Sequence, residues 1–225
     1  MKNLITSPQE SGLRFFVAQD GSGMGSAPRS AARSSTIIDA AFFNRPADVL
    51  ARDLVGRILQ TSIGGEVTSG VITETAAYTG ANDPQSHEYK TRKGSCPISW
   101  QPGSLYVYST QGHTMLTVAA APFSGGATVL VRALEPLAGV DSMRLRSPIG
   151  FEKITMGPGN LSRALGITAA HNGVNILSPD TQIAILPGFA LTPTQVTATN
   201  RKGDPNDAAE QLRFFRTGSE WVSRR

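Results

Sequence analysis

The residues best suited to chemistry lie between Glu74 and His87, at the end of a β-branched, threonine-rich run. Because side chains alternate between the two faces of a strand, Glu74, Ala76 and Tyr78 are expected to share one face. The run breaks at Asn82-Asp83-Pro84, and a histidine follows. A carboxylate, a small gap, a phenol and an imidazole thus come in order, a set that can line a pocket and move a proton beside it.

A second group of polar side chains lies in the stretch 104–119, which reads as two short strands around Gly112. Alternation places Tyr106, Tyr108 and Thr110 on one face of the first strand. Tyrosines at such positions either pack half-buried or offer flat surfaces for stacking, and the pattern leaves both open.

One charged residue, Arg132, lies within an otherwise aliphatic run, ATVLVRAL. Because burying an unpaired charge costs roughly several kcal/mol, we expect Arg132 to pair with a carboxylate such as Glu135 or to reach an anion in a groove. Lys90, Arg92 and Lys93 cluster in a basic, irregular segment and are either solvated loop charges or phosphate contacts.

Short helices and strands must position these groups. A helix is predicted from Pro46 to the glycine pair at 64 and 65, since proline suits a first turn and apolar residues then recur at helical spacing. Those apolar residues are Leu50, Leu54 and Ile58.

Two further helices are predicted in the second half of the chain. Pro136 is expected to begin one that runs through Met143 to Leu145. A Gly-Pro-Gly turn with Asn160 as the cap precedes another, which ends at Gly166.

The last third of the chain has short β runs at 175–177 and 182–186, and a hairpin is predicted around Thr217-Gly218. Strands outnumber helices and are mostly joined by turns. The pattern therefore predicts a single compact α+β domain built on an antiparallel sheet.

Composition bounds the class of protein. The chain has 225 residues, of which 40% are hydrophobic, so we expect one domain at 37–225 after a disordered, Gly/Ser/Ala/Arg-rich tail at 1–36. Cys96 is the sole cysteine, so no internal disulfide and no cysteine-built zinc site is expected, and with only three histidines no metal site is expected either.

Charge and hydropathy favour an intracellular protein without a membrane segment, because no run of about 18 apolar residues occurs. The net charge is +4, from 21 basic and 17 acidic residues, and 4 of the basic and 2 of the acidic residues precede Thr36. This small excess suits a polyanionic partner but does not by itself predict nucleic-acid binding.

Five segments carry a family resemblance: VITETAAYTGANDPQSH, PGSLYVYSTQGHTMLTVAA, VLVRALEPLAG, GPGNLSRALGI and LRFFRTGSEWVS. In this order, over about residues 40–223, they resemble the alkyladenine (3-methyladenine) DNA glycosylase family, of the human alkyladenine glycosylase type. The resemblance implies a curved antiparallel sheet, flanking helices and a β-hairpin that enters the DNA minor groove. It also implies a monomer, in the nucleoid or nucleus, that flips a damaged purine out of double-stranded DNA. Water then cleaves the N-glycosidic bond without a cofactor.

The resemblance assigns the stacking pocket to Tyr78, His87 and Tyr108, and the arginine that holds the flipped nucleotide to Arg132. By the bacterial spacing, Thr117 aligns with a pocket asparagine that helps to reject guanine. That change suggests altered base selection, with tolerance of a guanine-derived lesion.

DNA contacts are expected from Tyr106, Gln111, Arg132 and Asn160. Gln111 aligns with the wedge that fills the vacated stack, an aromatic residue in the human enzyme. A glutamine can fill that gap and hydrogen-bond to the orphaned base, but it stacks less well. Asn160 occupies a position where the family often has a lysine. The change from lysine to asparagine removes one phosphate contact.

The main departure is Ala76, which occupies the place of the glutamate that activates water in the family. A positioned acid or base contributes about 100- to 10,000-fold in rate. Glu74 lies on the same face, about 7 Å away along a strand, and either replaces that glutamate or is only structural. Otherwise the enzyme excises only cationic lesions, whose charge makes the base a good leaving group, or the protein, natural or inactivated, binds lesions silently. A small-molecule hydrolase that has reused the fold is a further alternative.

Overall fold

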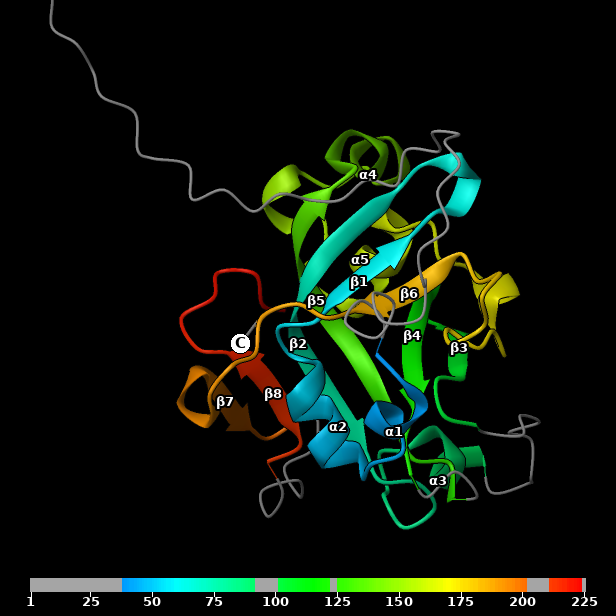
Figure 1. The fold of residues 1–225 in the computed structure, drawn as a ribbon, viewed down its shortest axis with the longest axis vertical. Coiled ribbons are helices and arrows are strands. Elements are labelled where there is room, and N and C mark those ends of the chain that lie inside the picture. Colours follow the sequence, from blue (N-terminus) through cyan, green and yellow to red (C-terminus); the bar gives the residue numbers. More distant parts are fainter. Residues whose placement is uncertain (1–37, 92–100, 122–124, 202–210, 224–225) are drawn as a thin grey trace, which may run out of the picture.

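The computed structural model describes residues 38–91, 101–121, 125–201 and 211–223. Over these residues it contains one antiparallel sheet that curls into a half-barrel, with short helices beside it (Figure 1). The predicted α+β class is confirmed. The tail at 1–36, Arg92, Lys93 and Cys96 lie outside the described residues.

In the part of the chain that the structure describes, eight strands form the sheet in the order β3-β4-β5-β2-β1-β6, with β8 paired to β2 and β7 paired to β8. All of these pairings are antiparallel. The strands are β1 Ile58–Thr61, β2 Thr68–Tyr78, β3 Leu105–Thr110, β4 His113–Ala119, β5 Thr128–Ala138, β6 Ile183–Leu186, β7 Val196–Thr199 and β8 Arg213–Arg216. The two strands predicted around Gly112 are therefore present as the β3–β4 hairpin.

β2 is the strand around which the sheet is organised. Its β-branched residues favour an extended backbone, and it pairs with β5 along most of its length. Its other edge pairs with β1 at 68–71 and with β8 at 74–76. The register against β5 shifts on both sides of Glu74, and such irregularities re-aim side chains and are common beside functional sites.

The helices in the described ranges are α1 Ala40–Phe43, α2 Ala47–Leu54, α3 His87–Thr91, α4 Val140–Arg146 and α5 Pro158–Ala164. In Figure 1, α1, α2 and α3 lie in the lower half of the molecule, and α4 and α5 in the upper half. α2 packs against β2 and β5, and α5 packs against β4 and β5. Leu50, Leu54, Ile72, Leu161 and Leu165 are fully buried in the one core that joins these elements.

The helix predicted from Pro46 is shorter than its apolar spacing suggested. Pro46 caps α2, which ends at Leu54, and the chain then turns at Gly56, whose φ is 91°. Ile58 begins β1 instead of continuing the helix. The third apolar position therefore belongs to a strand because a left-handed glycine interrupts the helix.

The predicted starts of the two later helices are also corrected. Pro136 lies inside β5, opposite Gly70 of β2, and α4 begins only at Val140. Gly157, with φ 109°, caps α5, so Asn160 is a residue within the helix and not its cap. The side chain of Asn160 donates to the carbonyl oxygen of Met156 at 2.8 Å.

The predicted hairpin around Thr217-Gly218 is wrong, because the described residues after that turn form no strand. The partner of β8 is β7, which precedes it in the chain by more than a dozen residues. The run predicted at 175–177 makes only an isolated bridge, between Ser104 and Asn175, whereas β6 matches the run at 182–186.

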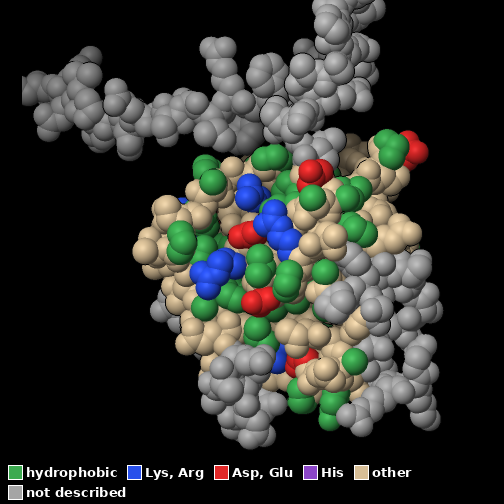
Figure 2. Space-filling model, turned by 60° about the horizontal axis from the view of Figure 1, so that its bottom comes forward, with side chains coloured by type: hydrophobic (Ala, Val, Ile, Leu, Met, Phe, Trp, Pro, Cys, Tyr) green, Lys and Arg blue, Asp and Glu red, His purple; other side chains and the backbone are tan. Residues whose placement is uncertain are grey.

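Charged side chains do not gather by sign on the face shown in Figure 2. Basic and acidic side chains lie beside one another there, with hydrophobic side chains between them. Among the described residues, no helix has the length and apolar character needed to cross a bilayer.

Candidate active site

β2 directs Glu74, Ala76 and Tyr78 away from α2. The intervening Thr75 donates from its hydroxyl to the carbonyl oxygen of Ala51 on α2, at 2.7 Å, and Ala77 belongs to the hydrophobic core. The alternation expected along this strand therefore holds after the register shift at Glu74.

A cavity of about 290 Å³ opens beside the end of β2. Five predicted site residues line it: Tyr78, His87, Tyr106, Tyr108 and Thr117. Its size is near the lower end of the range for small-molecule sites, roughly 300 to 1,000 Å³. The structure thus brings together side chains from β2, α3, β3 and β4.

Three of these rings form one aromatic wall, defined here as His87, Tyr106 and Tyr108. The centroid of the His87 ring lies 5.0 Å from that of Tyr108 and 5.5 Å from that of Tyr106, and the two tyrosine centroids are 5.0 Å apart. The planes differ by only 15° to 24°. The Tyr106 hydroxyl and His87 Nδ1 share a hydrogen bond that fixes the imidazole. A wall of nearly parallel rings offers a flat surface to another planar group.

Tyr78, the remaining aromatic ring of the cavity, is supported by a residue that the sequence analysis did not single out. The guanidinium carbon of Arg201 lies 4.8 Å from the Tyr78 ring centroid. Arg201 also binds Asp83 in a bidentate ion pair, with N–O distances of 2.5 and 2.9 Å, and donates to the Ala77 carbonyl oxygen at 2.9 Å. Asp83 in turn accepts backbone hydrogen bonds from Thr79 and Gln85, both at 3.0 Å. The turn after β2 and the Tyr78 ring are therefore held by one buried charge pair.

Two ionisable groups near the cavity have shifted pKa values. Burial would raise the pKa of Asp83, but the hydrogen bonds and charge of Arg201 outweigh burial and hold it below its usual range. Burial, together with the Tyr78 phenol, raises the pKa of Tyr108 to about 12, against a smaller opposing effect of Arg132. Tyr108 therefore stays protonated at neutral pH and cannot serve as a base.

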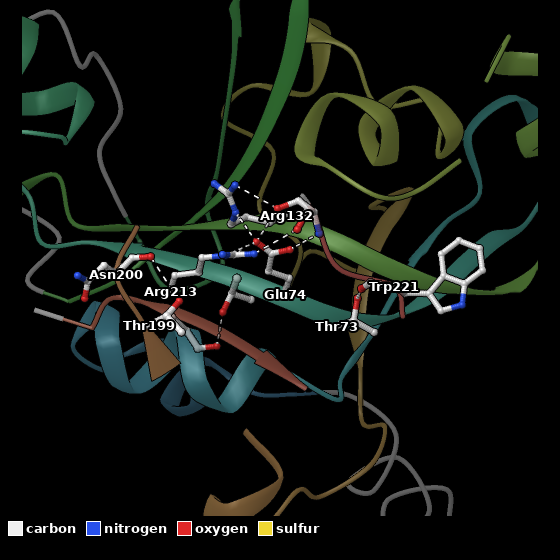
Figure 3. Close-up of polar contacts among 10 residues, drawn as sticks. Thr73, Glu74, Arg132, Thr199, Asn200, Arg213 and Trp221 are labelled. Carbon is white, nitrogen blue, oxygen red and sulfur yellow. Dashed lines mark hydrogen bonds and ion pairs between the residues drawn. The ribbon is translucent and has the colours of Figure 1, made fainter. Parts of the chain in front are cut away.

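Glu74 lies at the centre of a second buried network (Figure 3). Its Oε1 accepts from Nε of Arg132, Nε of Arg213 and the hydroxyl of Ser223, each at 2.7 Å, and its Oε2 accepts from the Ser223 backbone N–H. The carboxylate is fully buried. Burial would raise the pKa of Glu74, but Arg213, Arg132 and Ser223 together hold it below its usual range.

The network supplies the partner of Arg132, which was expected to pair with a carboxylate such as Glu135 or to reach an anion in a groove. Arg132 pairs with Glu74, and Glu135 instead pairs with Arg216 at 2.8 Å on the surface. Arg132 follows Val131, the ladder partner of Thr75, so it lies beside the irregularity at Glu74. Two guanidinium groups, those of Arg132 and Arg213, share the one carboxylate.

Ala76 lies next to this network, opposite Arg213 on β8 and Leu130 on β5, and is fully buried. Its methyl group cannot accept a proton. In the cavity, the Thr117 hydroxyl donates to the Tyr106 carbonyl oxygen at 2.7 Å, so its proton is already used. The site therefore combines an aromatic cavity with a position at Ala76 that has no acid or base.

Two of the predicted DNA contacts, Gln111 and Asn160, are not among the residues that line the cavity. Gln111 occupies the exposed tip of the β3–β4 hairpin with φ 49°, the one positive value at a non-glycine position in the described ranges. Gly112 follows with φ 75°, so both turn residues are left-handed, as in a two-residue hairpin turn. Asn160 lies on α5, and its side chain donates to the carbonyl oxygen of Met156, which precedes that helix. In the described part of the chain, no group of three or more His, Cys, Asp or Glu side chains is arranged to hold a metal ion.

The chain is similar in sequence to a family of known proteins. The family model described as "Methylpurine-DNA glycosylase" matches residues 41–220. A Koribacter versatilis protein is 35% identical over 204 residues, covering 87% of this chain and 97% of the relative. A Methanoculleus marisnigri protein is 36% identical over 195 residues, covering 84% and 99%, and one from Oceanobacillus iheyensis is 33% identical over 189 residues, covering 81% and 93%. Each is named "Putative 3-methyladenine DNA glycosylase".

Proposed function

This chain belongs to the methylpurine-DNA glycosylase family, and we propose that it rotates a damaged purine out of double-stranded DNA into the aromatic cavity and hydrolyses its N-glycosidic bond. Within the family we group it with the human alkyladenine glycosylase type. It acts as a monomer and needs no cofactor.

The aromatic cavity is the observation that carries this proposal. A flipped base would stack between Tyr78 and the aromatic wall, since these rings line the same cavity. Flipping costs roughly a few kcal/mol, less for a damaged or mispaired base, and stacking on an aromatic side chain recovers about 1 to 3 kcal/mol per base. Arg201, whose guanidinium group lies over the Tyr78 ring, keeps that ring in place while the base enters.

The chemistry must proceed without a carboxylate at position 76. Glu74 accepts four hydrogen bonds and has no exposed surface, so we assign it to positioning Arg132 and not to activating water. Tyr108, with a pKa of about 12, stays protonated. No group of the described network beside Ala76 is therefore available to take a proton from the attacking water.

A cationic lesion does not need a base to activate the attacking water, because its base is already a good leaving group. When the bond between C1′ and the base nitrogen of an N3- or N7-alkylpurine breaks, the electron pair neutralises the positive charge of the base. Water then adds to C1′ and releases its proton to solvent. Electron-rich ring faces also attract cations, by about 0.5 to 2 kcal/mol each, so the cavity favours such bases before the bond breaks.

The remaining assignments concern contacts with the DNA and the choice of base. Gln111 fills the gap left by the flipped base, Arg132 and Tyr106 hold the flipped nucleotide, and Asn160 lies toward the DNA backbone. Thr117, which offers no free proton, admits guanine-derived bases.

Ala76 supports a second candidate, a catalytically silent lesion-binding protein that uses the same cavity to mark or shield damage. Without a base at this position, the loss of about 100- to 10,000-fold in rate corresponds to roughly 3 to 5 kcal/mol of barrier. That loss is large enough to abolish turnover on neutral lesions.

The two candidates separate in a single-turnover excision assay. Duplexes carrying 3-methyladenine, 7-methylguanine, hypoxanthine or ethenoadenine are incubated with excess protein, beside the Ala76→Glu variant. Release of the two cationic bases by the original chain identifies an enzyme. Binding of every duplex without release, together with cleavage by Ala76→Glu, identifies the silent form. Absence of both binding and release refutes both candidates and favours a hydrolase of small molecules.

A further inference from the structure

Gln85 carries a feature that the proposed chemistry does not use. It lines the aromatic cavity, and its side-chain nitrogen Nε2 is buried without a hydrogen-bond partner. In the described ranges it is the one buried side-chain nitrogen or oxygen in this state. A buried donor without a partner costs about 1 to 3 kcal/mol, and native structures keep such groups rarely.

A backbone hydrogen bond anchors Gln85 beside the cavity. Its N–H donates to Asp83 Oδ1 at 3.0 Å, and Asp83 is bound by Arg201. Two other polar groups of the cavity lining already have partners, since the Thr117 hydroxyl donates to a carbonyl oxygen and the Tyr106 hydroxyl pairs with His87. Among the buried side-chain nitrogen and oxygen atoms of the described ranges, Nε2 of Gln85 is therefore the donor that a bound base could still satisfy.

We propose that Gln85 reads the flipped base by donating from Nε2 to the carbonyl oxygen at C6 of an oxopurine. This inference rests on the proposed function and deepens it. An adenine-type lesion carries an amino group at C6, which would leave two donors facing each other and unpaired. Together with the need for a cationic leaving group, this selects N7-alkylguanine as the lesion best suited to the cavity.

The test measures equilibrium binding by fluorescence anisotropy, so that it does not depend on catalysis. Two matched duplexes carry either hypoxanthine or unsubstituted purine, which lacks the oxygen at C6. The proteins are the original chain, Gln85→Leu and Gln85→Glu, with Gln182→Leu as the matched control, because Gln182 is exposed and lies outside the cavity. Comparing this affinity ratio between proteins cancels the different flipping costs of the two bases, because those costs belong to the DNA and are the same for every protein.

We expect the original chain and Gln182→Leu to share one hypoxanthine-to-purine affinity ratio. In Gln85→Leu that ratio should fall about tenfold, the value of one neutral hydrogen bond, and in Gln85→Glu it should fall further, because a carboxylate repels the carbonyl oxygen. An unchanged ratio in both Gln85 variants, with thermal melting like that of the original chain, overturns the assignment. If the original chain binds neither duplex better than undamaged DNA, the proposed function fails and the assignment fails with it.

Discussion

Replacing Glu74 with glutamine should destabilise the fold strongly, because Glu74 joins four separate parts of the chain. Its carboxylate lies on β2 and binds Arg132 on β5, Arg213 on β8 and Ser223 after β8. The Glu74→Gln side chain keeps the shape but loses the charge, and it places an amide N–H among groups that are all donors. The change thus tests whether this glutamate is structural.

The expected size of the destabilisation follows from how deeply these side chains are buried. The side chains of Glu74, Arg213 and Arg132 are 0%, 6% and 15% exposed. Breaking a buried ion pair by removing one partner costs about 3 to 5 kcal/mol, and here two guanidinium groups lose their partner at once. Since a domain of this size loses roughly 2 to 4 °C of melting temperature per kcal/mol, we expect a fall of about 6 to 20 °C.

The assay is urea unfolding, followed by fluorescence and by circular dichroism, at several pH values. Because the pKa of Glu74 in the fold is below its usual value, this carboxylate stabilises the protein at pH values above the unfolded pKa. Its contribution is lost as the pH falls through the folded pKa. The difference between the original chain and Glu74→Gln should therefore be largest near neutral pH and shrink in acid.

Glu135→Gln is the matched control, because Glu135 makes the same kind of pair with Arg216 while both side chains are about 40% exposed. That change should cost no more than about 1 kcal/mol. If Glu74→Gln unfolds within about 1 kcal/mol of the original chain and yet loses base excision, the structural assignment is refuted, and Glu74 becomes the base that replaces the family's glutamate.

Three further perturbations probe the pocket and the hairpin. Tyr108→Ala should weaken binding to a lesion duplex, but not to undamaged DNA, by about 1 to 3 kcal/mol in a titration; equal affinities would remove Tyr108 from the stacking surface. Asp83→Asn should lower the free energy of unfolding by about 3 to 5 kcal/mol, because it leaves buried Arg201 unpaired, whereas Asp141→Asn, in an exposed pair, should change it by under about 0.5 kcal/mol in the same denaturant series. Gln111→Gly should raise stability by up to about 1 kcal/mol, since φ is 49° there, while weakening lesion binding; a gain in both would contradict its role as the wedge.

The local pattern of β2 was predictable from sequence, whereas its partners were not. Period-two alternation correctly placed Glu74, Ala76 and Tyr78 on one face, because that pattern depends only on neighbouring residues. A carboxylate was expected as one of two partners for Arg132, but the example that the sequence offered was the nearby Glu135, and the structure uses Glu74, 58 residues earlier. Such a pair depends on which strands adjoin and in which register, and these are properties of the whole sheet.

The ion pair that supports the pocket was also not predictable from neighbouring residues. Asp83 was recognisable as a turn residue, but its ion pair with Arg201 spans 118 positions, so nothing local pointed to Arg201. The same is true of Arg213 in the closing segment, which lies opposite Ala76. In the described part of the chain Glu74 and Asp83 are buried acids, and each needs a cation, but the sequence alone does not say which cation lies beside it in the fold.

The most direct test of the central claim, that this cavity receives a flipped purine, uses the fluorescence of ethenoadenine placed in a duplex. Emission from this base depends on its stacking partners, so it changes when the base leaves the helix for the rings of Tyr78 and Tyr108. We predict that the original chain changes the emission in a saturable way, at protein concentrations that match its binding curve, and that Tyr78→Ala with Tyr108→Ala abolishes the change. Tight, saturable binding with unaltered emission would mean that the base stays in the helix, and would contradict the account.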